Sequence, residues 1–190
     1  TRSFIPAMPS HHTHTVEQLL SHRACLLDKP SPEPKKQYNS AMSAAKTIWK
    51  NPLLSSCTPK IGTGSTYMYS NFAFTLLGAV LETRGKKNIV QLLQSYLTKP
   101  FGLSSLRAEY PLTANYDRSE RYVGKKKIYL WTRENSNWKV LAGGMEIHVV
   151  DLARLGIKLK KGQVMSNATR TVMWTAPDET MKNYALGWGV

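Results

Sequence analysis

The stretch GSTYMYSNFAFTLLG, residues 64–78, passes from small polar residues through two tyrosines into an apolar helical pattern. Apolar side chains recur on one helix face at Phe74, Leu77 and Leu81. Ser70 or Asn71 can cap the start of this helix, because a side-chain oxygen there accepts backbone N–H groups of the first turn. The pattern predicts a helix over residues 71–83 that directs Tyr69 and Asn71 toward one cleft.

Other helices are expected on both sides of this segment. Thr15 and Gln18 have the spacing of a capping box, which predicts a short helix ending near His22. Helical spacing continues over residues 40–49, 88–98 and 149–159, and from Ser166 to Met173. Gly85 is expected to end the central helix and Pro100 the one after it. Large and small residues alternate over 184–190, which predicts a C-terminal strand.

Composition indicates a globular chain with a basic surface. The 190 residues are 42% hydrophobic and 20% charged, and the net charge is +14. Such values argue against disorder, and no apolar run approaches the ~18 residues of a membrane-spanning helix. The basic residues are spread along the chain without an aromatic-interleaved stripe, so no nucleic-acid partner is expected. An anionic cell envelope or membrane surface remains open as a partner.

Six landmarks, in order, resemble one family. They are Thr15–Leu26 (TVEQLLSHRACL), Tyr69-Ser70-Asn71, Lys99–Leu103 (KPFGL), Ala142–Met145 (AGGM) with Asp151–Arg154 (DLAR), Met173-Trp174-Thr175, and Tyr184–Trp188 (YALGW). The chain resembles class C β-lactamases, penicillin-binding D-alanyl-D-alanine peptidases and related esterases. One departure is Arg23-Ala24-Cys25, where the family usually has Thr-Ser-Gly.

The resemblance implies an α/β (α+β) fold of the β-lactamase/transpeptidase type, with an antiparallel sheet flanked by helices. This chain would hold mostly the helical subdomain and one sheet strand. The implied activity is that of a serine hydrolase, which cleaves a β-lactam, peptide or ester through an acyl-enzyme. Tyr69 would be the catalytic proton shuttle, made basic by a neighbouring lysine. Asn71, Ser70, Gly143 and Gly144 would bind a small-molecule or peptide substrate, although the glycine pair is also read as a tight turn.

The family's Ser-x-x-Lys nucleophile motif precedes the segment that begins here at Thr15, and its Lys-Thr-Gly or His-x-Gly strand would follow Trp188. Residues 1–190 are therefore expected to form a single, incomplete domain. Ser43-Ala44-Ala45-Lys46 matches the first motif but stands in the wrong order, so it is interpreted as a helix flank. The alternative is a catalytically inactive relative that serves as a binding or assembly module.

The remaining reactive residues are open to simple interpretations. Cys25 and Cys57 can form a disulfide or be two small buried residues. His11, His12 and His14 lie close together but form a poor zinc site without further ligands, and His22 is expected to be a hydrogen-bonded helix-end residue. No metal or organic cofactor is implied. The resemblance favours a periplasmic or secreted location.

Overall fold

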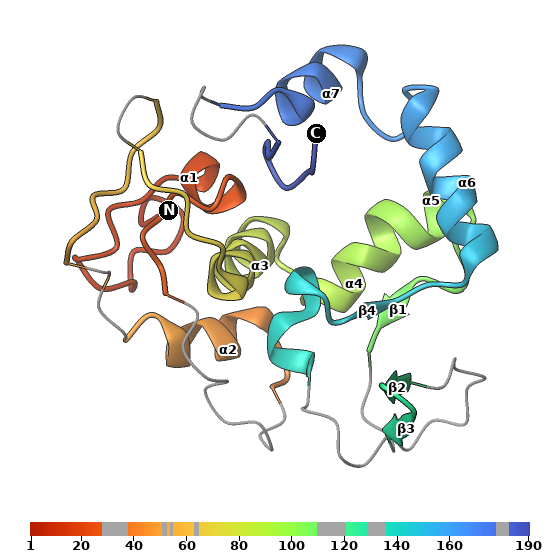
Figure 1. Cartoon of the computed structure of the whole chain (residues 1–190), viewed down its shortest axis with the longest axis horizontal. Helices are drawn as coiled ribbons and strands as arrows, with labels where there is room; N and C mark the ends of the chain where they lie inside the picture. The colour runs from red at the N-terminus through yellow and green to blue at the C-terminus, as the bar shows by residue number, and fades with distance from the viewer. Residues whose placement is uncertain are drawn as a thin grey trace.

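The computed structural model describes residues 1–27, 38–50, 53, 55–62, 65–109, 121–128, 136–177 and 183–190. Helix α3 (Asn71–Gly85) lies at its centre, with α1 (Val16–Leu20) and α2 (Ala41–Ile48) beside it (Figure 1). The chain continues through α4 (Ile89–Leu93), a π-helical turn (Gln94–Thr98) and α5 (Lys99–Phe101). A 3-10 segment η3 (Ser136–Ala142) precedes α6 (Val149–Lys160) and α7 (Asn167–Trp174), which lie at the rim.

Helix α3 forms where the apolar pattern predicts it. The Ser70 hydroxyl caps its start by accepting the N–H of Ala73 at 3.4 Å. Its buried residues lie on every side, as expected for a helix in the middle of a core. Its end differs from the prediction, because Lys86, with φ +50°, adopts the left-handed conformation while Gly85 stays helical. Gly85 is needed instead for space, since a Cβ there would collide with Leu92.

The helix after α3 does not stop at Pro100 as predicted. The chain stays helical through Phe101 and ends at Gly102, which has φ +64°. Pro100 stands in the first turn of α5, directly after the π-helical turn, where the regular α-helical hydrogen-bond pattern is already interrupted. Proline is therefore found at the junction of these two helical segments.

Hydrophobic residues from α1, α2, α3 and the first loop form the main core. Its members include Met8, Leu19, Trp49, Leu76 and Val80. The α2 and α3 backbones approach closely where Gly78 faces Ala41, because a Cβ at Gly78 would lie 2.8 Å from the Ala41 Cβ. A second cluster packs α4 against β1 and η3, so α3 is enclosed by core on several sides.

One buried carboxylate joins three helices. Glu82, on α3, is 9% exposed. Its Oε1 accepts the N–H groups of Ala41 at 2.9 Å and Ile89 at 2.8 Å, and its Oε2 accepts that of Met42 at 2.8 Å. These donors belong to the first turns of α2 and α4, whose N–H groups have no partner within their helices. Glu82 therefore caps both helices from the side of a third.

The described strands form two short antiparallel pairs. Strand β1 (Arg107–Ala108) pairs with β4 (Met145–Glu146), and β2 (Arg121–Val123) pairs with β3 (Lys126–Ile128). The predicted C-terminal strand is wrong. Residues 184–190 form a turn in which Gly187 has φ +82° and the Ala185 N–H reaches the Trp188 carbonyl at 2.8 Å. Contacts with α1 and α7 hold this conformation, since the Gly187 N–H binds the Leu20 carbonyl at 3.0 Å and the Leu186 N–H binds the Met173 carbonyl at 3.1 Å.

The two cysteines pair, which settles the alternative left open by the sequence. Cys25 and Cys57 form a disulfide whose Cα atoms lie 5.7 Å apart. It joins the segment after α1 to the segment that leads toward Tyr69. None of the helices in the described ranges has the length and hydropathy needed to cross a membrane.

His12 and His14 form a buried hydrogen-bonded pair. His12 Nε2 lies 2.7 Å from the Trp49 carbonyl, and its Nδ1 lies 3.0 Å from His14 Nε2. Burial, together with the neighbouring His12, lowers the pKa of His14 to about 3. Within the described residues, no group of three or more His, Cys, Asp or Glu has an arrangement that could hold a metal ion.

Candidate active site around Tyr69

Tyr69 stands at the exposed start of α3. Its side chain is 54% exposed, and its hydroxyl donates to Asn71 Oδ1 at 3.3 Å. This distance exceeds the usual 2.5–3.0 Å of an O–H···O bond, so the contact is weak. The structure therefore brings two sequence-predicted site residues together and leaves the Tyr69 hydroxyl accessible to a closer partner.

His22 holds the backbone on both sides of Tyr69. Its carbonyl accepts the N–H of Met68 at 2.7 Å, and its Nδ1 accepts the N–H of Ser70 at 3.1 Å. The His22 and Tyr69 rings also contact each other, with centroids 4.5 Å apart and planes tilted by 43°. His22 itself has φ +57°, a left-handed conformation that costs free energy for a residue other than glycine. The contacts around it must maintain that conformation, and together they fix the Tyr69 backbone.

The second imidazole nitrogen of His22 contacts Tyr184. Because Nδ1 accepts from Ser70, neutral His22 carries its proton on Nε2. Nε2 lies 3.0 Å from the Tyr184 hydroxyl oxygen and so donates to it. Burial, with smaller contributions from the nearby Tyr67 and Tyr69, raises the pKa of Tyr184 to about 12. Tyr184 therefore stays a neutral phenol at any physiological pH.

Tyr67 and Arg23 line the inner side of this ring cluster. The Tyr67 ring lies edge-on to His22 and Tyr184, at centroid distances of 5.8 and 5.6 Å. Burial raises the pKa of Tyr67, the neighbouring Tyr69 adds to the effect, and the Arg23 charge opposes it. Arg23 is fully buried, lies 6.0 Å from the Tyr67 ring and donates to Ser65 Oγ at 3.1 Å. A fixed positive charge thus lies behind the tyrosines.

Sequence reasoning missed Tyr184, Tyr67 and Arg23 as neighbours of Tyr69. In the sequence, Arg23 stands out only as a departure from the family pattern. Tyr184 lies 162 residues from His22 along the chain, and no local periodicity links positions so far apart. The sequence does show that Tyr184 and His22 each belong to a landmark of one family, but it does not indicate that they touch.

Ser70 and the glycine pair have structural roles in this arrangement. Ser70 is 1% exposed, its hydroxyl caps α3, and its N–H binds His22. Gly143 has φ +118° in the turn before β4, which agrees with the tight-turn interpretation. Gly144 is buried, and its N–H and carbonyl bind Lys139 and Glu109. Substrate binding by these three residues stays a prediction.

The Ser-x-x-Lys match at Ser43 forms part of a helix cap. Ser43 takes part in the capping box of α2, where its hydroxyl donates to the Ser40 carbonyl at 2.8 Å. Its role agrees with the helix-flank interpretation. A second match, Ser136-Asn137-Trp138-Lys139, follows Tyr69 in the chain and forms part of η3. There Lys139 Nζ lies over the Trp138 ring, 5.4 Å from its centroid.

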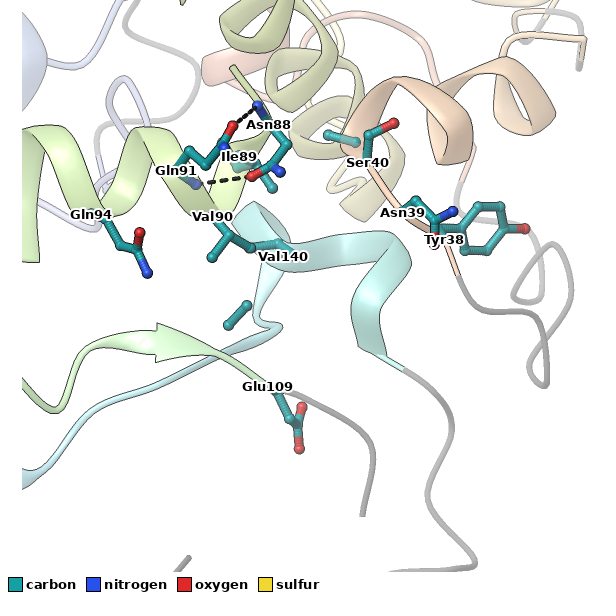
Figure 2. Close-up of a pocket in the computed structure, with 12 residues that line it drawn as sticks. Tyr38, Asn39, Ser40, Asn88, Ile89, Val90, Gln91, Gln94, Glu109 and Val140 are labelled. Carbon is teal, nitrogen blue, oxygen red and sulfur yellow. Dashed lines mark hydrogen bonds between the residues drawn. The ribbon is translucent and has the colours of Figure 1, made fainter. Parts of the chain in front are cut away.

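A cavity of about 460 Å³ lies between the starts of α2 and α4, β1 and η3. Figure 2 shows Asn88 and Gln91 at its edge, joined by the two hydrogen bonds that cap α4. This cavity is near the C-terminal end of α3, where Glu82 lies, and Tyr69 precedes the N-terminal end, roughly three helical turns away. It is therefore separate from the tyrosine cluster.

The fold and this site define a class of protein. A family model described as Beta-lactamase matches residues 2–190, and the chain belongs to the beta-lactamase family. Similar solved structures support the fold. FmtA from Staphylococcus aureus covers 100% of this chain with a TM-score of 0.78 at 16% identity, and a D-stereospecific amidohydrolase from Streptomyces covers 98% with a TM-score of 0.73 at 18% identity. EstCE1, a hydrolase with promiscuous acyltransferase activity, covers 98% with a TM-score of 0.68 at 19% identity.

Particular relatives are found among animal proteins. Serine beta-lactamase-like protein LACTB, mitochondrial, from mouse is 23% identical over 178 residues, which is 82% of this chain and 31% of the mouse protein. The human LACTB protein is 27% identical over 149 residues, which is 67% of this chain and 27% of the human protein. The chain thus spans about a third of these curated relatives, and it spans 51%, 61% and 60% of the three solved proteins above.

Proposed function

We propose that the protein containing this chain is a serine hydrolase that cleaves an amide or ester bond through an acyl-enzyme, with Tyr69 as its proton shuttle. The observation that supports this proposal most strongly is the geometry at the start of α3. The Tyr69 hydroxyl is exposed and weakly held by Asn71, whereas its backbone is fixed on both sides by His22. A group that must accept and return a proton needs this combination of an accessible atom and a fixed position.

In the proposed reaction, Tyr69 accepts a proton and returns it once during acylation and once during deacylation. As a phenolate, Tyr69 accepts the proton of the serine hydroxyl while the serine oxygen bonds to the substrate carbonyl carbon. The bond to the amine or alcohol then breaks, and Tyr69 returns the proton to that leaving group. Water repeats the sequence on the acyl-enzyme and releases the acid. Asn71 would contact the substrate from the same side as Tyr69, since its Oδ1 already lies beside the tyrosine hydroxyl.

The serine and the lysine that favours the phenolate are proposed to lie outside these 190 residues. Two observations support this. Ser43 is engaged in a helix cap, and the chain spans little more than half of the similar solved proteins. Residues 1–190 would then form one part of a larger β-lactamase-like domain. Cysteines that pair also support a periplasmic or secreted location, because disulfides persist in oxidising compartments.

The test is an intact-mass spectrum of the full-length protein before and after incubation with a fluorophosphonate, which reacts with activated serines. The proposal expects one covalent adduct, and peptide mapping should place it on a serine outside residues 1–190. An adduct on Ser43 would overturn the assignment of the nucleophile. A protein that forms no adduct and cleaves neither nitrophenyl ester, D-alanyl peptide nor β-lactam would overturn the enzymatic function and leave a binding module.

A further inference from the structure

The C-terminal turn lies against the start of the candidate site. Gly187 is tied to the Leu20 carbonyl of α1, and a Cβ at Gly187 would lie 3.6 Å from the Phe74 ring of α3. Figure 1 shows this dark blue segment beside α1 and above α3. The turn is closed by an isolated antiparallel bridge between Tyr184 and Gly189. Tyr184 is therefore presented to His22 from a segment with its own fixed conformation.

The His22 imidazole links this contact to Ser70, the residue that follows Tyr69. The imidazole can accept the Ser70 N–H only when Nδ1 carries no proton, so the tautomer must place the proton on Nε2. The Tyr184 oxygen is the acceptor of that proton at 3.0 Å. Without an acceptor on Nε2, the other tautomer becomes more populated, and its Nδ1–H would face the Ser70 N–H. Two donors would then oppose each other immediately beside Tyr69.

We propose that Tyr184, acting through the His22 imidazole, is a positioning residue for Tyr69. Its hydroxyl holds His22 in the tautomer that binds Ser70, and the same ring supports the Tyr69 side chain at a centroid distance of 4.5 Å. The inference rests on the proposed function, since it assigns Tyr184 to the step that Tyr69 performs. It accounts for a hydroxyl that is partly buried among aromatic rings instead of lying at the surface.

The first experiment measures the tautomer of His22 directly. The ¹⁵N chemical shifts of an imidazole show which nitrogen carries the proton. Wild-type protein should show protonated Nε2 and unprotonated Nδ1, and Tyr184→Phe should move the two shifts toward each other. Tyr67→Phe is the matched control, because it removes a hydroxyl from the same ring cluster but leaves the Tyr184–His22 contact in place. Unchanged His22 shifts in Tyr184→Phe would overturn the proposal without reference to activity.

The second experiment measures ester hydrolysis by the full-length protein. Tyr184→Phe should lower kcat about two- to tenfold, the effect of one hydrogen bond, with little change in KM. Tyr96→Phe, at a 68% exposed tyrosine on the π-helical turn, should leave both constants unchanged. A change in KM alone, or an unchanged kcat, would overturn the positioning role.

The two proposals fail in different ways. An active wild-type protein whose Tyr184→Phe variant keeps full kcat would overturn this inference and leave the proposed function standing. A wild-type protein without turnover or fluorophosphonate labelling would overturn both. Folding of each variant is checked by circular dichroism, and amide exchange at Ser70 should accelerate in Tyr184→Phe while exchange in the middle of α3 stays the same.

Discussion

Replacing Glu82 by glutamine should destabilise the fold strongly, because this carboxylate caps two helices at once. It accepts three backbone N–H groups, from Ala41, Met42 and Ile89, at 2.8–2.9 Å. Hydrogen bonds to a charged group contribute roughly 1.5–3 kcal/mol each. Glutamine keeps one oxygen, which can still bind two donors more weakly, but its NH₂ group must face the third donor. We expect a loss of about 3 kcal/mol in the free energy of unfolding.

Urea denaturation followed by circular dichroism measures this loss, and thermal denaturation should show a Tm lower by roughly 6–12 °C for a chain of this size. Glu17→Gln is the matched control, because Glu17 is exposed in the first turn of α1, and a surface change of this kind alters stability by about 0.5 kcal/mol or less. If Glu82→Gln were no less stable than Glu17→Gln, the capping role would be refuted.

Three further predictions concern stability. Gly78→Ala should destabilise the protein by about 1–2 kcal/mol, since its Cβ would lie 2.8 Å from that of Ala41. Gly156→Ala should stabilise it by about 0.5–1 kcal/mol, because nothing in the described part of the chain lies within 4 Å of the new atom. Denaturation curves in which both variants shift alike would contradict this. Removing the disulfide with Cys25→Ser and Cys57→Ser should cost about 4 kcal/mol for a sequence separation of 32 residues, measured against wild type under non-reducing conditions. Because the pKa of buried His14 is lowered to about 3, only the unfolded chain protonates this imidazole as pH falls below about 6.5. The free energy of unfolding should therefore keep its full value above that pH and be lower by about 2 kcal/mol at pH 5. His14→Gln should reduce the difference in unfolding free energy between pH 7.5 and pH 5, and an identical difference would count against a buried neutral His14.

Local signals predicted much of the fold. Ser70, Ser166 and the Thr15 capping box mark helix starts that the structure confirms, because a cap is decided by residues three apart. Pro100 and Gly85 misled for the same reason. Each has a second physical role, as a residue at the junction of two helical segments and as a site of close packing with Leu92, and only the tertiary contacts decide between the roles.

The parts that the sequence could not provide depend on distant residues. Glu82 is an acidic residue inside an apolar helix, and this position alone does not reveal that its carboxylate caps α2 and α4. The alternation over residues 184–190 is typical of a strand, yet contacts with Leu20 and Met173 make it a turn. The candidate site shows the same division, since Tyr69 and Asn71 follow from one short motif while the contact of His22 with Tyr184 requires the folded chain.

The most direct test of the account is the acylation rate of the full-length protein with Tyr69→Phe. The substitution keeps the ring that contacts His22 and removes only the hydroxyl that would carry the proton. Rapid mixing with p-nitrophenyl acetate measures the burst of nitrophenol from the first acylation. We predict a rate lower by about 10²–10⁴-fold, the usual contribution of a positioned acid–base group, with Tyr96→Phe unchanged. A Tyr69→Phe variant that acylates at the wild-type rate would contradict the assignment of Tyr69 as the proton shuttle.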